Sequence, residues 1–385
     1  MALMTSLVAL SIDSMLPALP EIGTQLNVSN PNHNQLVISL LFLGLSIGQM
    51  IFGPLSDSIG RKPAIYFGFI IVIFGYLLSV TATNFYMMLA GRFLQGFGLS
   101  GPRIITMALI RDQYHGDAMA KVMSFIMMVF ILVPCIAPIM GQGILLVGTW
   151  RYIFAFNLIL IILAAIWFWH RQPETLKIEN RIPFSVKRII SAIVSIVSNR
   201  VSMAYTLISG LVFSAFLGYI TSAQQVFQIQ YDLGKIFPFV FATLALSIGL
   251  AGFLNGRIVM QYGSQLIVRK SIRTKFFISC LFLGITWFFD GNPPLFSVIM
   301  YFILVLFCVG FLFGNVNSLA MEPLGHIAGL GSAVIGSVST LIGVSIGGLI
   351  GQSYDGTIIP MIIGFVILSG LSSLLMIWVE NSNKY

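Results

Sequence analysis

Residues 53–65 read GPLSDSIGRKPAI. In this stretch Gly53 and Gly60 flank an acid, Asp57, and two cations follow at Arg61 and Lys62. Glycine permits tight backbone geometry, and basic residues mark the cytoplasmic ends of membrane helices. Because long apolar runs lie on both sides of the stretch, we interpret it as a short charged connection between two membrane helices.

The composition excludes a water-soluble protein. Hydrophobic residues make up 57% of the 385 residues and charged residues only 8%, whereas a soluble domain carries about 25% charged residues. Long apolar runs indicate spanning helices, because the strands of a membrane β-barrel alternate apolar and polar residues. The net charge of +8 is therefore interpreted through membrane orientation, and nucleic-acid binding is not expected. The three cysteines show no metal-ligand or disulfide spacing.

A membrane crossing takes roughly 20 apolar residues. The chain contains twelve such runs, at about 2–20, 35–56, 64–82, 85–110, 119–147, 151–170, 200–223, 235–258, 272–290, 295–317, 330–352 and 357–379. We therefore predict an all-α membrane protein with twelve transmembrane helices in two six-helix bundles. The N-terminal bundle is 1–170, the long basic segment 171–199 is a linker, and the C-terminal bundle is 200–385.

The basic residues predict the orientation in the membrane. Sixteen of the 20 Lys and Arg residues, Lys275 among them, fall in even-numbered connections or the C-terminal tail. Two, Arg151 and Lys235, fall in odd-numbered connections, and Arg92 and Arg103 lie within the fourth run. Because basic residues concentrate in cytoplasmic loops, both termini and the 171–199 linker are predicted to be cytoplasmic.

The two halves of the chain show a weak internal repeat. Gly53 and Gly60 end the second run, and Gly256 and Gly263 end the eighth run at the same seven-residue spacing. Equivalent glycine pairs in two groups of six runs indicate an internal duplication. Repeated halves with a substrate site near the membrane midplane are a common plan among transporters.

The charged connection resembles the signature of a known family. It matches the G-x-L-x-D-x-x-G-R-K pattern of the major facilitator superfamily at Gly53, Leu55, Asp57, Gly60, Arg61 and Lys62. The resemblance implies that these residues latch one conformation of a transporter, and Arg61 is expected to pair with Asp112 or Asp117. Without the resemblance, the same residues fit an ordinary basic loop that only sets topology.

Further stretches resemble the bicyclomycin/chloramphenicol-resistance branch of the drug:proton antiporters in that superfamily. They are ALSIDSMLPALPEI at 9–22, GRFLQG at 91–96, VPCIAPIMGQ at 133–142, WRYIFAFN at 150–157 and MEPLGHIAG at 321–329. The antiporter motif in the fifth run keeps Pro138 and Gly141, but Ala137 and Gln142 stand where glycines are usual. The resemblance covers the whole chain, and none of its motifs specifies a substrate.

Asp13 is the acid that stands clearly inside an apolar run. Asp13 and Arg92 lie at similar depths, each seven residues from the outer end of its run, or roughly 10 Å at 1.5 Å per residue. An acid held between the opposing influences of burial and a nearby arginine can take up and release a proton. We predict that Asp13 and Arg92 couple transport to protons. The alternative is that Asp13 is a packed, hydrogen-bonded structural acid.

Two further groups of residues are candidates with a packing alternative. Pro134, Pro138 and Gly141 in the fifth run favour a bend that controls cavity closure. Tyr219, Gln225 and Asn315 are candidates for a substrate cavity in the C-terminal half. Ordinary helix packing explains each group equally well or better.

The predicted function is proton-coupled export of small amphipathic compounds by alternating access. The alternatives are an exporter of a specific metabolite or siderophore, and a transport-inactive sensor or scaffold. No nucleophile–base pair, nucleotide-binding loop or metal cluster indicates an enzyme, a cofactor or a metal. We expect a monomer in the bacterial inner membrane, with a small molecule, protons and the lipid bilayer as its partners.

Overall fold

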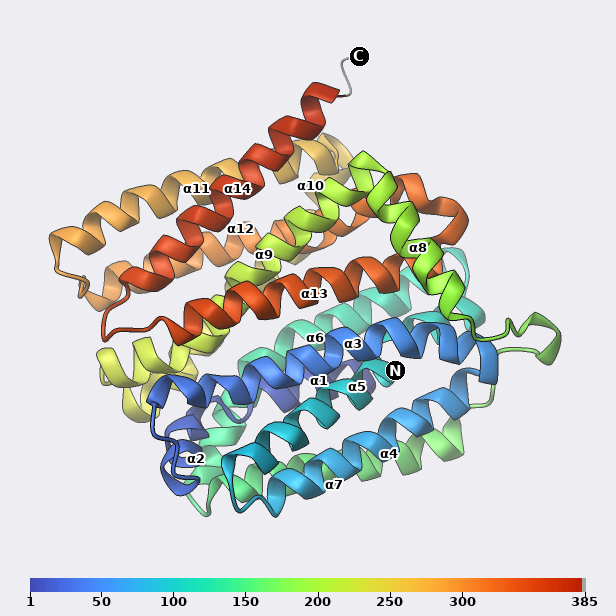
Figure 1. The fold of residues 1–385 in the computed structure, drawn as a ribbon, viewed down its shortest axis with the longest axis horizontal. Helices are drawn as coiled ribbons and strands as arrows, with labels where there is room; N and C mark the ends of the chain where they lie inside the picture. The colour runs from blue at the N-terminus through green and yellow to red at the C-terminus, as the bar shows by residue number, and fades with distance from the viewer. Residues whose placement is uncertain (383–385) are drawn as a thin grey trace. The chain divides into compact units, whose positions relative to one another are not determined.

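The computed structural model describes residues 1–382, except the side chains of residues 117, 120, 124, 127, 130, 131, 326, 328 and 382. The described chain is mostly helical, without a strand (Figure 1). Eleven described helical segments are long and apolar enough to cross a membrane, and the apolar stretch Leu132–Leu145 belongs to a further helix, α6. The prediction of an all-α membrane protein with twelve spanning helices is confirmed.

The chain forms two compact units, Met1–Ser191 and Ala192–Tyr385. In the N-terminal unit, the first span is divided between α1 (Ala2–Asp13) and α2 (Leu19–Gln25). The other spans of this unit are α3 (Leu36–Ile59), α4 (Arg61–Val80), α5 (Phe85–Gln113), α6 (Gly116–Leu145) and α7 (Trp150–Arg171). The central packing contacts join α3 and α4 to α5, α1 to α6, and α4 to α7.

The C-terminal unit repeats this arrangement. Its spans are α9 (Arg200–Gln224), α10 (Phe237–Tyr262), α11 (Ser264–Phe288), α12 (Leu295–Met321), α13 (Ala328–Gln352) and α14 (Ile359–Ser382). Here α10 and α11 pack on α12, α9 packs on α13, and α11 packs on α14. Each of these pairs is the counterpart, six spans later, of a pair in the N-terminal unit. The internal duplication suggested by the glycine pairs is therefore present in the helix packing.

The same glycine turn occurs in both units. Gly60 follows the last residue of α3 and precedes the first residue of α4, with φ at 109°. Gly263 occupies the same position between α10 and α11, with φ at 74°. These positive φ values are rarely adopted by residues with a side chain. A glycine at each turn lets one membrane helix end and the next begin without an intervening loop.

The segment 171–199 contains a helix that was not predicted. α8 spans Val186–Ser198, and α9 begins two residues later at Arg200. At 13 residues α8 is too short to cross a bilayer. The prediction of 171–199 as a linker did not include this helix.

Candidate functional site

The first membrane span is broken at its acid. α1 ends at Asp13, a 3-10 turn follows at Leu16–Ala18, and α2 begins at Leu19. Pro17 has no N–H to donate to the carbonyl of Asp13, four residues earlier, so regular helix cannot continue through this position. The Asp13 side chain is only 5% exposed. An ionisable group at such depth is energetically expensive in a membrane protein, which makes Asp13 a candidate for a functional role.

Arg92 on α5 binds the end of α1 and is fully buried. Its Nη2 donates a hydrogen bond of 3.0 Å to the carbonyl of Ser11, and its Nε donates one of 3.0 Å to the carbonyl of Val37. Its Nη1 donates to Oε1 of Gln95 at 2.7 Å. The ring of Phe154 lies 5.6 Å from the guanidinium carbon. These acceptors and the ring compensate a buried charge that would otherwise be unstable.

Gln95 and Tyr76 extend the network around Arg92. The Nε2 of Gln95 donates to the carbonyl of Gly75 at 3.1 Å and to Oγ of Ser79 at 2.8 Å. The hydroxyl of Tyr76 lies 2.5 Å from that of Ser11. The arginine and glutamine of the GRFLQG motif thus act as a structural pair that connects α5 to α1 and α4. Sequence reasoning did not select Tyr76, one of the few hydroxyl-bearing residues in the third run.

On its other side, the break in the first span packs against α6 and α7. A Cβ added to Gly141 would lie 1.7 Å from the carbonyl oxygen of Ser14, so this approach requires a glycine. The Nδ2 of Asn157 on α7 donates to Oγ of Ser14 at 3.0 Å. Asn157 was not predicted as a site residue, although it is the polar residue that ends WRYIFAFN. The break is therefore held from two sides, at the residue directly after Asp13.

The structure brings Asp13 and Arg92 to the same break but does not pair them. Among the described residues, no ion pair includes Asp13, and the Arg92 donors bind Ser11, Val37 and Gln95. The predicted joint role of Asp13 and Arg92 in proton coupling stays a prediction, and in this structure Arg92 lies near the acid without forming an ion pair with it. The arginine binds a main-chain carbonyl because the end of α1 leaves that acceptor open.

The glycine turn after α3 forms a charged network. The Arg61 guanidinium donates to Asp57 through Nη1, to Oγ of Ser56 at 2.9 Å, and through Nε to Oδ2 of Asp112 at 3.2 Å. Asp112 lies at the end of α5, so Arg61 connects two helix ends. The expected pairing of Arg61 with Asp112 is present, and the side chain of residue 117 lies outside the described part of the chain.

The beginning of the linker covers this turn. The Glu174 carboxylate accepts the N–H groups of Arg61 and Lys62, both at 3.0 Å. These are the first residues of α4, where a negative charge is favoured by the helix dipole. Further along, the N–H of Ile182 donates to the carbonyl of Asp57 at 2.9 Å. The linker is thus part of the network around the motif, which sequence reasoning missed.

The prolines of the fifth run lie inside an uninterrupted helix. α6 runs through both Pro134 and Pro138, and each proline deprives a carbonyl one turn earlier of its N–H partner. Gly141, one turn after Pro138, makes the close contact with the first span. Of the three residues predicted for this helix, Gly141 therefore contacts the candidate site directly.

The three candidate cavity residues of the C-terminal half are buried within their unit. The Tyr219 ring packs against those of Phe241 and Phe302, with centroid distances of 5.7 and 5.3 Å. Asn315 donates to Oδ1 of Asn255 at 2.7 Å. Gln225 is 2% exposed and begins a turn of π-helix at Gln225–Gln230. A substrate role for these three residues stays a prediction.

Lys275 was assigned wrongly from the sequence. It was counted with the cytoplasmic connection although the predicted run, 272–290, already contains it; α11 begins at Ser264, eight residues before that run, so Lys275 lies about three turns inside the helix. Its side chain has 0% exposure, and its Nζ has no hydrogen-bond partner among the described residues. The two phenylalanines that follow Lys275 in the sequence were the available sign that the span had already begun.

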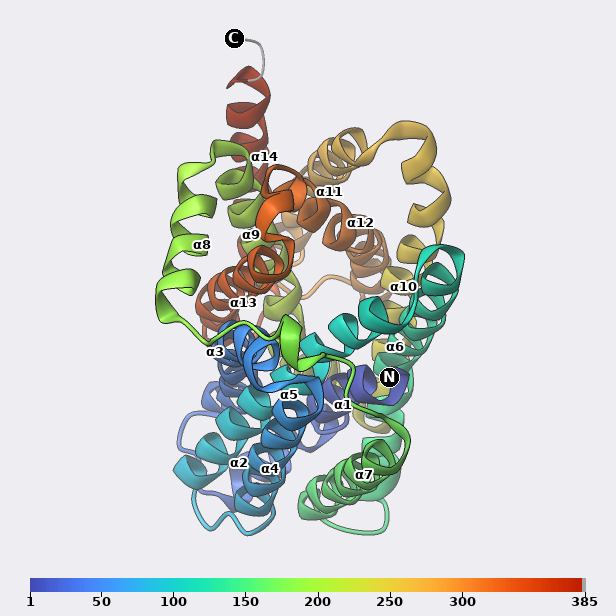
Figure 2. The ribbon, with the colours of Figure 1, turned by 90° about the vertical axis from the view of Figure 1, so that its right-hand side faces the viewer.

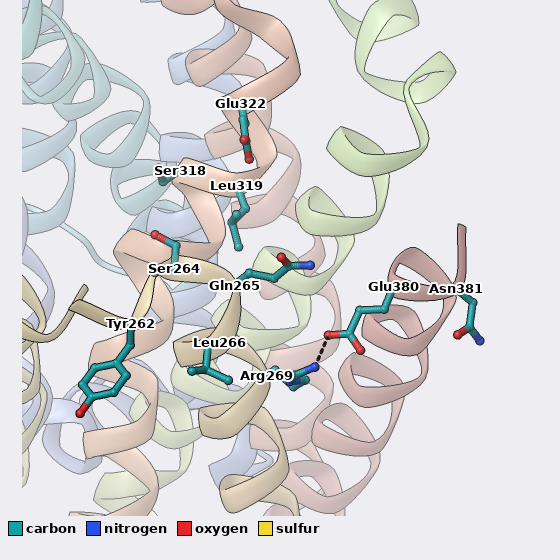
Figure 3. A pocket seen from close by; sticks show the side chains of 11 residues that line it. Tyr262, Ser264, Gln265, Leu266, Arg269, Ser318, Leu319, Glu322, Glu380 and Asn381 are labelled. Carbon is teal, nitrogen blue, oxygen red and sulfur yellow. Dashed lines mark hydrogen bonds and ion pairs between the residues drawn. The ribbon is translucent and has the colours of Figure 1, made fainter. Parts of the chain in front are cut away.

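A cavity of about 850 Å³ lies at one end of the C-terminal unit (Figure 3). It is lined by the α10–α11 turn and by residues near the ends of α12 and α14, namely Tyr262, Gly263, Ser264, Gln265, Leu266, Arg269, Ser318, Leu319, Glu322, Glu380 and Asn381. Arg269 and Glu380 form an ion pair of 3.5 Å at its edge. None of Tyr219, Gln225 and Asn315 lines it. Among the described residues, no cluster of three His, Cys, Asp or Glu side chains is arranged to hold a metal ion.

Comparison with known proteins gives a consistent result. Residues 1–348 match the model of the Major Facilitator Superfamily. The chain is 30% identical to the MFS-type transporter YdgK of Bacillus subtilis, over 91% of this chain and 87% of that one. It is also 30% identical to a bicyclomycin resistance protein homolog of Haemophilus influenzae, over 94% and 90% of the two chains. The human organic anion transporter MFSD10 shares the fold, with a TM-score of 0.71 at 17% identity over 98% and 97% of the chains.

Proposed function

This chain belongs to the Major Facilitator Superfamily, and we propose that it is a proton-coupled exporter of small amphipathic compounds. The observation that carries the proposal is the buried acid at the break in the first span. Asp13 occupies a position where helix geometry is interrupted, so its surroundings can rearrange without breaking a continuous helix. An acid in such a place can bind a proton in one conformation and release it in another.

The hydrogen bonds around the break support this role for Asp13. Arg92 fixes the carbonyl of Ser11 before the acid, and Asn157 fixes the hydroxyl of Ser14 after it. A change in the packing of α5 or α7 is therefore transmitted to the acid from either side. In this proposal Arg92 positions the end of α1, and the proton is carried by Asp13.

The network around Arg61 supports a gating role for the turn after α3. Exposed ion pairs contribute only about 0–1 kcal/mol each, and here Asp57 is 45% and Asp112 24% exposed, whereas the Arg61 side chain that they share is 11% exposed. The partly exposed carboxylates allow these pairs to form and break in a transport cycle. We assign the latch to Asp57, Arg61 and Asp112, with Gly60 providing the turn and Glu174 holding the start of α4.

The resistance-protein relative supports drugs as substrates, with bicyclomycin as a first candidate. The distribution of basic residues supports a placement with both termini and the linker in the cytoplasm of a bacterial cell. In this placement the compound leaves the cytoplasm while protons enter, driven by the gradient across the inner membrane. The proposed transporter needs no cofactor and acts as a monomer.

Transport by the purified protein in sealed liposomes tests the proposal. An imposed proton gradient is expected to drive uphill movement of bicyclomycin, chloramphenicol or another member of a panel of amphipathic drugs. A protonophore is expected to abolish that movement. If drugs move only down their own gradient and the imposed proton gradient has no effect, proton coupling is wrong.

A further inference from the structure

We propose that α8 is a membrane-surface helix whose exposed apolar stripe inserts among anionic phospholipids. The residues of α8 read VKRIISAIVSIVS, from Val186 to Ser198. Successive residues of a helix are turned by about 100°. Placed at this interval, the side chains of α8 fall into three sectors along its length, and each sector has a different environment.

The first sector faces the protein. Ala192 and Ile196 are buried in the apolar core of the C-terminal unit, together with Tyr205 and Ile208 of α9, and Ile193 packs against the same core. This sector fixes the rotation of the helix about its own axis. The directions in which the other two sectors point are therefore set by the fold.

The second sector is apolar but exposed. It consists of Val186, Ile190, Val194 and Val197, whose side chains are each between 54% and 58% exposed. These four residues recur at the spacing of one helix face and form a continuous stripe. Such a stripe is unfavourable in water and matches the acyl-chain boundary of a bilayer.

The third sector is polar and basic. It contains Lys187, Arg188 and three serines, and the sequence has no acidic residue between Glu179 and Asp232. Basic residues beside an apolar stripe are typical of helices that lie in the membrane interface. Their charge complements anionic headgroups, and this complementarity favours lipid as the occupant of the stripe over a second copy of the chain.

The chain itself places α8 at the membrane boundary. α8 ends at Ser198, and the membrane span α9 begins at Arg200, with Asn199 capping it by accepting the N–H of Ser202 at 3.0 Å. Figure 1 shows α8 running across the direction of α9, and Figure 2 shows α8 at the left-hand edge of the ribbon. Because α8 is joined to the start of α9 by one residue and lies across it, α8 is placed along the membrane surface where α9 enters the bilayer.

Spin-label accessibility in nanodiscs with one copy of the protein tests the proposal. Labels are attached at Ile190→Cys, Val194→Cys and Ser191→Cys in a Cys280→Ser background, since Cys135 and Cys308 are buried and Cys280 is exposed. The labels at positions 190 and 194 are expected to collide with dissolved oxygen, because oxygen concentrates in the acyl region. Their accessibility to a water-soluble nickel complex is expected to be lower than that of position 191 by about threefold or more. The Cys280→Ser protein without a new cysteine measures background labelling.

Lipid charge is tested in the same nanodiscs by comparing phosphatidylcholine with a mixture containing phosphatidylglycerol. The anionic lipid is expected to lower nickel accessibility at position 194 further. The double variant Lys187→Gln/Arg188→Gln is expected to lose this response, whereas Arg171→Gln/Lys177→Gln, with the same charge change elsewhere in the linker, is expected to keep it.

Three results would overturn the proposal. Equal nickel accessibility at positions 190, 194 and 191 would place the stripe in water. Shielding of 190 and 194 from both oxygen and nickel would show that protein covers them. An unchanged response to anionic lipid in Lys187→Gln/Arg188→Gln would exclude the basic residues as the lipid contact. None of these measurements depends on transport, so failure here leaves the proposed function standing.

Discussion

Replacing Gly141 by alanine is expected to damage the break in the first span. The added Cβ would lie 1.7 Å from the carbonyl oxygen of Ser14, and real Cβ contacts essentially never fall under 3.0 Å. α6 and the first span must therefore separate by about 1.3 Å at this point, where the other partner is main chain and cannot rotate away. Overpacking of this kind costs about 1–3 kcal/mol of the free energy of unfolding.

Gly143→Ala provides the matched control for this prediction. Gly143 lies in the same helix, and an added Cβ there would have no neighbour within 4 Å. It gains the helix preference of alanine, up to about 1 kcal/mol, without the clash. Gly141→Ala is therefore expected to unfold about 2 °C or more below Gly143→Ala and to transport more slowly, because the displaced carbonyl directly follows Asp13. Thermal unfolding in detergent and proton-driven transport in liposomes measure the two effects. Equal melting and equal transport of the two variants would refute the close contact.

Three further substitutions test other parts of the structure. Asp57→Asn is expected to slow transport at normal expression, because it weakens the pairing with Arg61, and normal transport would leave Asp57 as a topology marker only. Glu174→Gln is expected to lower the free energy of unfolding by about 1 kcal/mol, because an amide cannot accept two N–H groups of α4 as a carboxylate does. Glu179→Gln in the same linker is the control, and equal denaturation curves of the two variants would contradict the role of Glu174 in holding the start of α4. Lys275→Met is expected to stabilise the protein by about 1–3 kcal/mol, because it removes a buried ammonium without a hydrogen-bond partner among the described residues. The exposed Lys270→Met is the control, and a larger loss of stability in Lys275→Met than in this control would show that Lys275 has a stabilising partner.

The overall fold was predictable because membrane insertion leaves strong marks on a sequence. The lengths of the apolar runs predicted the spans, and Gly60 indicated a turn that the structure repeats at Gly263. Helix ends were less predictable, since apolarity alone cannot show where a helix begins in the headgroup region. The ninth span therefore begins eight residues earlier than predicted, and Lys275, which was counted at its cytoplasmic edge, lies buried well inside the helix.

The candidate site was only partly predictable. The sequence selected Asp13, Arg92 and Gly141, and the structure gathers all three around the break between α1 and α2. It could not show that Arg92 binds the carbonyl of Ser11, because main-chain acceptors become available only where a helix ends. α8 was missed for a related reason. Its sequence does not show which apolar residues face the core and which are exposed, and only the core contacts in the structure separate the two groups.

Proton-driven transport by the Asp13→Asn variant tests the central claim most directly. The asparagine keeps the size of the side chain but cannot bind and release a proton near neutral pH. Purified wild-type and variant proteins are reconstituted in liposomes, a proton gradient is imposed, and the accumulation of a transported drug and its equilibrium binding are both measured. The account predicts that Asp13→Asn binds the drug but does not move it uphill. Uphill transport by the variant at the wild-type rate would contradict the account.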